Sequence, residues 1–214
     1  MNEKILTTTL KEFNESVASD SFAPGGGCVS ALSGSLGAAL GRMVLTLTIG
    51  KKKYAEFDKE NTELANKFSN LHKELMNAVE KDISGCKAIL EAMGLPKDTE
   101  AEKNVRKAAM SDASKKANEA PLEVCVRTIE LLRIFKSSIS KINRNTVTDW
   151  ACGSLQAYAA LEGAAMNAKI NLGSINDAKY IKETQENLRN MLGEARKLID
   201  EIRVHVHSSL DSTN

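Results

Sequence analysis

The feature that most constrains this chain is a nearly uncharged run of small and apolar residues from Cys28 to Ile49, with glycines at positions 34, 37 and 41. Because the run has no polar face, it predicts a helix that is buried all round. Its small residues let neighbouring helices, or a second subunit, approach closely. Arg42 interrupts it and amphipathic sequence follows, which argues against a membrane span. We therefore expect a central glycine- and alanine-rich helix.

The remaining segments have the pattern of amphipathic helices, because apolar residues recur every three or four positions. Aromatic residues make up only 4% of the chain and prolines number three, which favours packed helices over sheets. The expected fold is an all-α antiparallel helical bundle, forming a single domain over residues 1–214. Besides the central helix, the predicted helices run from about Thr9 to Ala18, Phe57 to Met93, Thr99 toward Asn118, Pro121 through Ile142, Trp150 to about Ala168 and Asp177 to Val206, before a frayed tail from Ser208 to Asn214.

Charge and cysteine usage exclude several classes of protein. With 29 basic and 28 acidic residues, the net charge of +1 gives no overall field that would attract nucleic acid or an anionic membrane. The N-terminus lacks the apolar core of a signal peptide, so we expect a cytoplasmic protein. The cysteines show no metal-ligand spacing and are expected to be reduced core residues, with no metal bound. They are Cys28, Cys86, Cys125 and Cys152.

A glycine cluster precedes the central helix. Pro24 is followed by Gly25, Gly26 and Gly27, so a helix N-terminus with several free main-chain N–H groups is expected there. Such a terminus can bind a carboxylate or another polar ligand with help from the helix dipole. The structural alternative is a tight connection that needs positive φ angles.

Three lysines follow the C-terminal end of the predicted central helix. Lys51, Lys52 and Lys53 lie where positive charge complements the C-terminal end of the helix dipole, and they could also meet an anionic substrate tail. A solvated charged face is the simpler interpretation. The histidines have no carboxylate or thiol motif around them, and we assign no role to His72, His205 or His207.

Two aspartates are candidates for proton transfer. Asp82 interrupts the apolar stripe of the long predicted helix, so it should be partly buried, and loss of hydration would raise its pKa toward the range a general acid or base needs. An ion pair with Arg106 or a lysine is the ordinary alternative. Asp149 follows Asn145 by four residues near a predicted helix start, where capping would also explain both residues.

The chain resembles a known family over essentially its full length. The run SFAPGGGCVSALSGSLGAALGRMVLTLTIGKKKYAEF is similar to the signature of the cyclodeaminase domain of formiminotransferase-cyclodeaminase, a family that also contains free-standing bacterial methenyltetrahydrofolate cyclohydrolases. EKDISGCKAILEAMGLPKDTEAEKNVRKAA resembles the family's Asp-bearing helix and the turn after it, and EAPLEVCVRTIELL its next helix. NRNTVTDWACGSLQAYAALEGAAMNAKINL resembles a later segment, with Thr148 where serine is usual.

The resemblance implies an all-helical homodimer that binds a tetrahydrofolate derivative as substrate, with no metal and no tightly bound cofactor. A separate formiminotransferase would load the formimino group. Asp82 and Asp149 match family positions and become the expected proton-transfer groups. The resemblance also suggests that Asn145 and the Gly25–Gly27 amides hold the pterin or the one-carbon group, and that Lys53 and Arg106 meet the glutamate carboxylates.

Three functions stay open on the sequence. The leading one is a formimidoyltetrahydrofolate cyclodeaminase, which closes the N5–N10 bridge to 5,10-methenyltetrahydrofolate and releases ammonia. The second is a methenyltetrahydrofolate cyclohydrolase, which opens that bridge with water to give 10-formyltetrahydrofolate. The third is a helical dimer that binds folate without turnover, against which the presence of both aspartates argues.

Overall fold

The predicted all-α fold is confirmed. The computed structural model describes residues 5–211, and every regular element within that range is a helix. The α-helices are α1 (Leu10–Val17), α2 (Gly26–Thr48), α3 (Asp58–Met93), α4 (Glu100–Ala117), α5 (Glu119–Ser138), α6 (Val147–Leu172) and α7 (Ala178–Asp211). Short 3-10 turns are η1 (Ile5–Thr7), η2 (Lys52–Phe57), η3 (Ile139–Lys141) and η4 (Arg144–Thr146).

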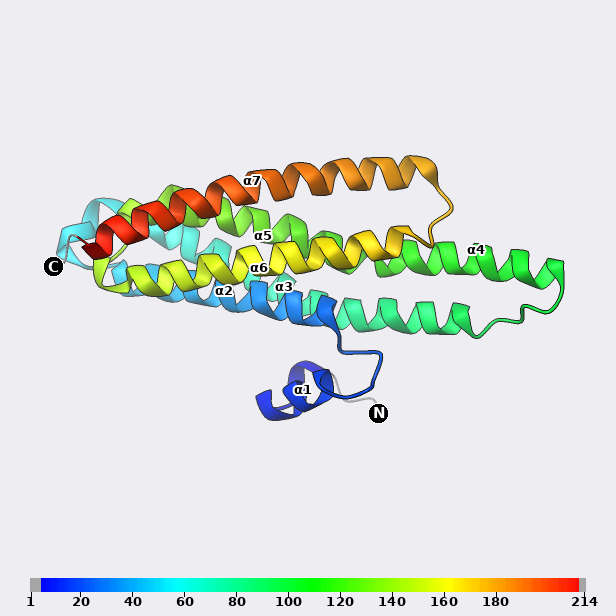
Figure 1. Ribbon diagram of the computed structural model, residues 1–214. Coiled ribbons are helices and arrows are strands. Elements are labelled where there is room, and N and C mark those ends of the chain that lie inside the picture. Colours follow the sequence, from blue (N-terminus) through cyan, green and yellow to red (C-terminus); the bar gives the residue numbers. More distant parts are fainter. Residues whose placement is uncertain (1–4, 212–214) are drawn as a thin grey trace.

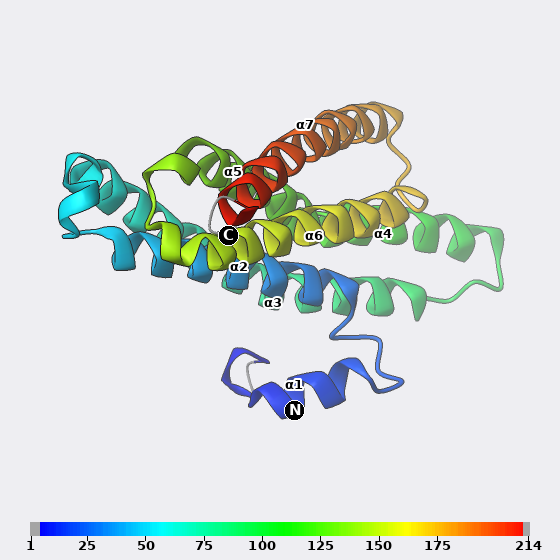
Figure 2. The same ribbon diagram turned by 60° about the vertical axis from the view of Figure 1, so that its left-hand side comes forward.

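Helix α2 lies between α3 and α6 in an elongated bundle (Figures 1 and 2). It packs against α3 on one side and α6 on another, and α5 also contacts it. Helix α7 covers α5 and α6, while α4 pairs with the far half of α3 and projects from one end of the bundle (Figure 1). The short helix α1 lies beside the bundle and buries none of its own residues.

The glycines of α2 allow this close packing, as the sequence predicts. A Cβ atom on Gly37 would lie 2.7 Å from the carbonyl oxygen of Gly153 on α6, closer than such atoms approach. A Cβ on Gly41 would enter the ring of Phe68 on α3. Helices α2 and α6 run antiparallel, because Gly26 near the start of α2 meets Asn167 near the end of α6. The small side chains therefore fix how closely three helices come together.

Replacing Gly37 with alanine is expected to lower the free energy of unfolding by about 1–3 kcal/mol, because the new methyl group must push the α6 backbone away. Gly193→Ala on α7 is a matched control. Nothing lies within 4 Å of a Cβ built on Gly193, so that substitution should stabilise the helix by roughly 0.5–1 kcal/mol. Urea unfolding of both variants measures the two changes in the free energy of unfolding. Equal stabilities of the Gly37→Ala and Gly193→Ala variants would contradict the close contact between Gly37 and Gly153.

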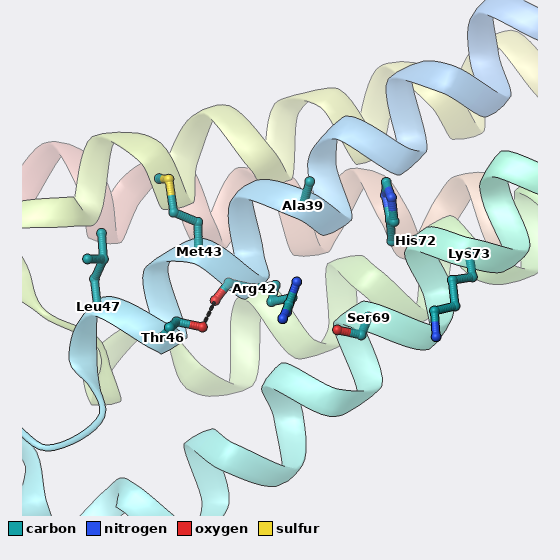
Figure 3. Close-up of a pocket in the computed structure, with 8 residues that line it drawn as sticks. All are labelled: Ala39, Arg42, Met43, Thr46, Leu47, Ser69, His72 and Lys73. Carbon is teal, nitrogen blue, oxygen red and sulfur yellow. Dashed lines mark hydrogen bonds between the residues drawn. The ribbon is translucent and has the colours of Figure 1, made fainter. Parts of the chain in front are cut away.

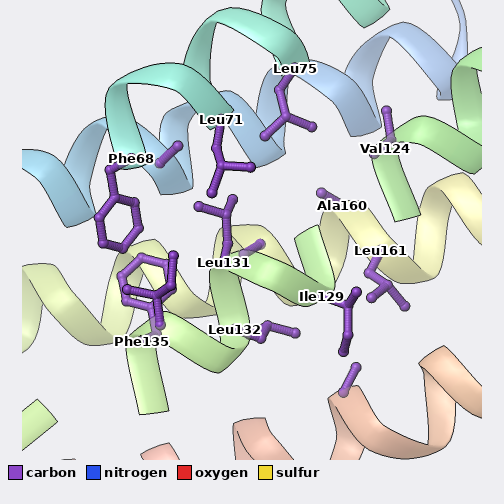
Figure 4. Packing of buried hydrophobic residues seen from close by; sticks show 14 of the residues in the cluster. Phe68, Leu71, Leu75, Val124, Ile129, Leu131, Leu132, Phe135, Ala160 and Leu161 are labelled. Atoms are coloured by element: carbon purple, nitrogen blue, oxygen red, sulfur yellow. The ribbon is translucent and has the colours of Figure 1, made fainter. Parts of the chain in front are cut away.

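The few aromatic residues of the core form one cluster. The rings of Phe68, Phe135 and Trp150 meet edge to face, with centroids 4.7–5.8 Å apart. The Trp150 indole Nε1–H donates a hydrogen bond of 2.9 Å to the carbonyl oxygen of Phe135, so its polar group is satisfied although the residue is fully buried. Figure 4 shows Phe68 and Phe135 next to a layer of leucines that continues along the bundle. This cluster ties α3, α5 and α6 together.

Several predicted helix ends are corrected. Helix α6 begins at Val147 rather than Trp150, because the Asn143 side chain accepts a hydrogen bond from the Asn145 amide and starts a 3-10 turn that leads into the helix. Helix α7 continues through Ser208 to Asp211, so the frayed tail is wrong for those residues, and positions 212–214 lie outside the described range. Helix α5 ends at Ser138 and its stripe continues through η3.

Two other expectations concern burial. Of the helices described, α2 is long and apolar enough to cross a membrane by length and composition, and just over half of that stretch is buried among its neighbours. The prediction that it is buried all round is wrong, because α3, α5 and α6 leave one side of α2 uncovered, where Val29, Leu36, Met43 and Leu47 are exposed. All four cysteines are free thiols, as expected. Cys28 and Cys125 are buried, but Cys152 is exposed on α6 and is not a core residue.

Candidate functional site

The glycine turn brings the start of α2 against two polar side chains. Gly26 abuts the side-chain amide of Asn167 on α6, and Gly27 abuts the carboxylate of Asp82 on α3, so tightly that a Cβ atom there would overlap it. Within residues 5–211, Gly50 alone has a positive φ angle, so the positive-φ explanation of this glycine cluster is wrong. Gly26 and Gly27 are needed for close approach, whereas a Cβ on Gly25 would make only an ordinary contact at 3.8 Å. They leave a helix N-terminus with an acid on one side and an amide on the other.

Asp82 is half-buried, as its place in the apolar stripe predicts. Its carboxylate Oδ2 lies 3.1 Å from the Cys28 thiol. The cations considered as ion-pair partners of Asp82 have other partners. Lys81 pairs with Glu123 at 2.5 Å, and Arg106 donates a hydrogen bond of 3.0 Å to the carbonyl oxygen of Met93. Asp82 therefore sits in the interface between α2 and α3 with a thiol as its polar partner.

Burial raises the pKa of Asp82 above its ordinary value, because loss of hydration disfavours the charged carboxylate. Hydrogen bonds from the thiol and the main chain of Cys28 oppose that shift by favouring the carboxylate. The pKa of the nearby Cys86 thiol is also raised, first by burial and then by the charge of Asp82. An acid with these properties can take up and release a proton nearer to neutrality than an exposed aspartate.

Asn167 is a site residue that the sequence does not single out. Its Nδ2 donates to the Gly163 carbonyl at 2.8 Å on the same helix, which holds the amide against Gly26 and leaves its oxygen as an acceptor. Its sequence signal is slight, because it is one of several polar residues in the alanine-rich helix α6. The antiparallel packing of α2 on α6 brings it to the site.

Three other predicted residues, Asn145, Asp149 and Lys53, lie near the opposite end of α2. Asn145 belongs to η4, and Asp149 lies in the first turn of α6, where its charge complements the positive end of the helix dipole. Lys53 is exposed in η2, just beyond the end of α2. The loops that carry them are joined, because the amide of Arg144 donates to the Tyr54 hydroxyl at 3.0 Å.

Asp82 and Asp149 are thus far apart within one chain. Asp82 meets α2 at Gly27, and α6 crosses α2 where Gly153 meets Gly37, ten residues further along α2. Asp149 precedes Gly153 by four more residues, which places the two carboxylates roughly 20 Å apart along the bundle axis. Lys53 and Arg106 are separated even further, by the length of α3, so within one chain they cannot serve the same ligand tail.

Arg106 lines a basic cavity of about 420 Å³ at the junction of α3, α4 and the end of α6. Its Nε is buried and has no hydrogen-bond partner. Gly173 at the rim follows Asn167 by six residues, which is roughly 9 Å along α6. The cavity therefore lies within reach of the Asp82 site. It is lined by Lys97, Lys103, Arg106, Lys107, Met110, Gly173 and Ser174.

A second groove, also about 420 Å³, runs between α2 and α3 further from Asp82 (Figure 3). Arg42, His72 and Lys73 give it a basic character. The His72 ring lies with Nδ1 3.1 Å from the carbonyl oxygen of Ser35, so Nδ1 carries the proton and donates. Lys73 at its near end precedes Asp82 by nine residues, roughly 14 Å along α3, so this groove and the Asp82 site are separate.

No cluster of three or more metal-ligating side chains occurs in the part of the chain that the structure describes. What the site near Asp82 offers is a carboxylate with a raised pKa, an amide acceptor and a helix N-terminus. This set suits proton transfer on a polar heterocycle.

Known proteins give the site a context. Residues 9–190 match the family model described as formiminotransferase-cyclodeaminase. The chain is 35% identical over 203 residues to the methenyltetrahydrofolate cyclohydrolase of Methylorubrum extorquens, covering 95% of this chain and 98% of that protein. It is also 35% identical over 196 residues to the formimidoyltransferase-cyclodeaminase of Gallus gallus, covering 90% of this chain but 36% of that longer protein.

The fold has a solved counterpart. The crystal structure of formiminotetrahydrofolate cyclodeaminase from Thermotoga maritima superposes with a TM-score of 0.80 at 23% sequence identity, covering 98% of this chain and 99% of that one. At that identity the likeness concerns the fold. The sequence matches carry the assignment, and the chain belongs to the formiminotransferase-cyclodeaminase family.

Proposed function

We propose that this protein is a folate enzyme that hydrolyses 5,10-methenyltetrahydrofolate to 10-formyltetrahydrofolate. The observation that carries the chemistry is the half-buried Asp82, which lies at the glycine-led start of α2 with the Cys28 thiol as its hydrogen-bond partner. The relative that matches almost from end to end, the Methylorubrum extorquens protein, is named for this reaction. That match supports the cyclohydrolase over the cyclodeaminase that the sequence alone favours.

In this reaction a water molecule adds to the positively charged methenyl carbon. Asp82, as the carboxylate, takes a proton from that water as the new C–O bond forms. The C–N5 bond then breaks, N5 keeps the electron pair and is protonated, and loss of the hydroxyl proton leaves the formyl group on N10. The net change is addition of one water and release of one proton. A second acid that protonates N5 is the role we assign to Asp149.

The cyclodeaminase remains the second candidate because the Gallus gallus relative carries that activity in its name. There N10 attacks the formimino carbon on N5, N10 loses its proton, and ammonia leaves after protonation. The same base and acid serve both reactions, since both build and break bonds at one carbon between the same two nitrogens.

The basic cavity around Arg106 suits the glutamate end of the substrate. With the pterin beside Asp82 and Asn167, the p-aminobenzoyl group would run along α6 toward Ser174 and the cavity. Its four cationic side chains would then face the glutamate carboxylates.

The distance between Asp82 and Asp149 supports a site shared by two subunits. Helix α2 carries a row of exposed apolar side chains at positions 29, 36, 43 and 47, a spacing typical of a helix that packs against another helix. Exposed Leu155, Met166 and Ile170 on α6 widen this face. Together these seven side chains expose roughly 600 Å² of apolar surface, near the ~800 Å² that each partner contributes to a standard interface.

In the proposed homodimer, a two-fold axis through the middle of that row reverses the direction of the partner's α2. The start of α2 in one subunit then faces the end of α2 in the other. This arrangement shortens the axial distance from Asp82 to Asp149 of the partner subunit to roughly 12 Å, and we assign the two carboxylates to one site that the substrate spans.

The reaction can be tested by giving the protein 5,10-methenyltetrahydrofolate and 5-formiminotetrahydrofolate in separate assays. We expect the methenyl absorbance to fall faster than in buffer alone, with no ammonia released. A rise of methenyl absorbance from the formimino substrate, with ammonia, would instead establish the cyclodeaminase. If neither substrate reacts above the buffer rate while folate still binds, the protein is a non-catalytic folate binder and this proposal is wrong.

A further inference from the structure

The polar partner of Asp82 is the thiol of Cys28, which takes no part in the bond changes of the proposed reaction. The Cys28 side chain is fully buried at the α2–α3 interface. Its Sγ lies 3.1 Å from Asp82 Oδ2 and 3.6 Å from the carbonyl oxygen of Val79, one turn earlier on α3. A thiol has one proton to donate, so these two acceptors share a single donor.

The two acceptors match the two protonation states of Asp82. When Asp82 is a carboxylate, the S–H group can donate to Oδ2. When Asp82 has taken up a proton, its own O–H can donate to the sulfur, and the S–H group can turn to the Val79 carbonyl. Neither state leaves a buried donor or acceptor without a partner, which would otherwise be costly.

We propose that Cys28 is a positioning residue for proton transfer by Asp82, holding the carboxyl group in one orientation while its proton comes and goes. This inference rests on the proposed function. Gly27 supports it, because a Cβ at that position would overlap the carboxylate, so the α2 backbone and the Cys28 thiol confine Asp82 from one side.

The thiol stays protonated in this setting. Burial, and then the negative charge of Asp82, raise the pKa of Cys28 far above its ordinary value, so it serves as a donor and not as a nucleophile. The second thiol near Asp82 is Cys86 on α3, whose pKa is raised in the same way. Glu123 on α5 is paired with Lys81, the neighbour of Asp82 on α3.

The test compares Cys28→Ala with Cys28→Ser, measuring kcat/KM for the substrate that the wild-type protein turns over, across the pH range. Loss of the S–H donor should lower kcat/KM about 10-fold and move its acidic limb to higher pH, because the carboxylate loses a hydrogen bond that favours it. Serine restores a donor with a stronger O–H group, so activity should recover and the acidic limb should lie at or below the wild-type pH.

Cys125→Ala is the matched control, because it removes a buried thiol that contacts the Leu161 carbonyl at 3.8 Å instead of Asp82. It should leave the pH profile unchanged. An active wild-type protein whose Cys28→Ala variant keeps the wild-type profile would overturn the positioning role and leave the proposed function standing. If the Cys28→Ala variant does not fold, the Cys28→Ser variant decides alone. A kcat/KM profile whose acidic limb lies at higher pH in Cys28→Ser than in wild type would overturn the positioning role of Cys28. A wild-type protein inactive on both folates overturns both proposals.

Discussion

Replacing Asp82 with asparagine is expected to reduce kcat by about 10²- to 10⁴-fold, the usual contribution of a positioned general base. Asparagine has nearly the same shape, and its amide oxygen can still accept from Cys28, so the packing around Gly27 should survive. Substrate affinity should therefore change little. Steady-state kinetics and folate binding measured on the same preparation check both parts.

The stability of this variant separates a catalytic role from a structural one. Because the folded-state pKa of Asp82 is raised, the folded protein binds this proton more tightly than the unfolded chain does, and the stability it contributes is lost as pH rises through the folded pKa. At neutral pH the charged carboxylate is thus a cost. Asp82→Asn should be at least as stable as wild type there.

Asp112→Asn on α4 is a suitable control, since it removes an exposed carboxylate outside the site. It should leave kcat unchanged. Unaltered turnover in Asp82→Asn would remove Asp82 from the mechanism, and a loss of turnover that merely follows unfolding would make it a structural residue.

Much of this fold can be predicted from the sequence, because hydrophobic periodicity and helix signals are local. The close packing of α2 against α3 and α6 follows from its small residues, although one side of the helix is exposed, and the partial burial of Asp82 follows from its place in an apolar stripe. The helix ends at Val147 and Asp211 were missed, since a 3-10 turn and the last turns of a docked helix depend on hydrogen bonds that periodicity does not reveal.

The arrangement of the candidate site depends on non-local packing. Asn167 reaches the glycine turn only because α6 runs antiparallel to α2, and nothing near Asn167 in the sequence indicates that. The same packing separates Asp82 from Asp149, although both fit one reaction on chemical grounds. Sequence patterns can identify such residues, but which subunit supplies each of them depends on how helices pair.

Replacing Asp149 with asparagine should also reduce kcat by about 10²- to 10⁴-fold if it supplies the second proton. The residue lies in the first turn of α6, half-buried, on the end of the bundle away from Asp82. Its loss should affect the reaction as strongly as that of Asp82 only if the partner subunit brings it to the same substrate. Sedimentation of the wild-type protein must then show dimers rather than 23.2 kDa particles at micromolar concentration.

The most direct test of this shared site is to mix the two inactive variants. Asp82→Asn and Asp149→Asn subunits, unfolded together and refolded in equal amounts, should give mixed dimers in half of the population. In each mixed dimer one of the two sites keeps both aspartates, so activity should return to about a quarter of wild type. A control mixture of Asp82→Asn with the double variant contains no intact site and should stay inactive. If the first mixture is equally inactive although mixed dimers form, Asp82 and Asp149 do not act together across the interface.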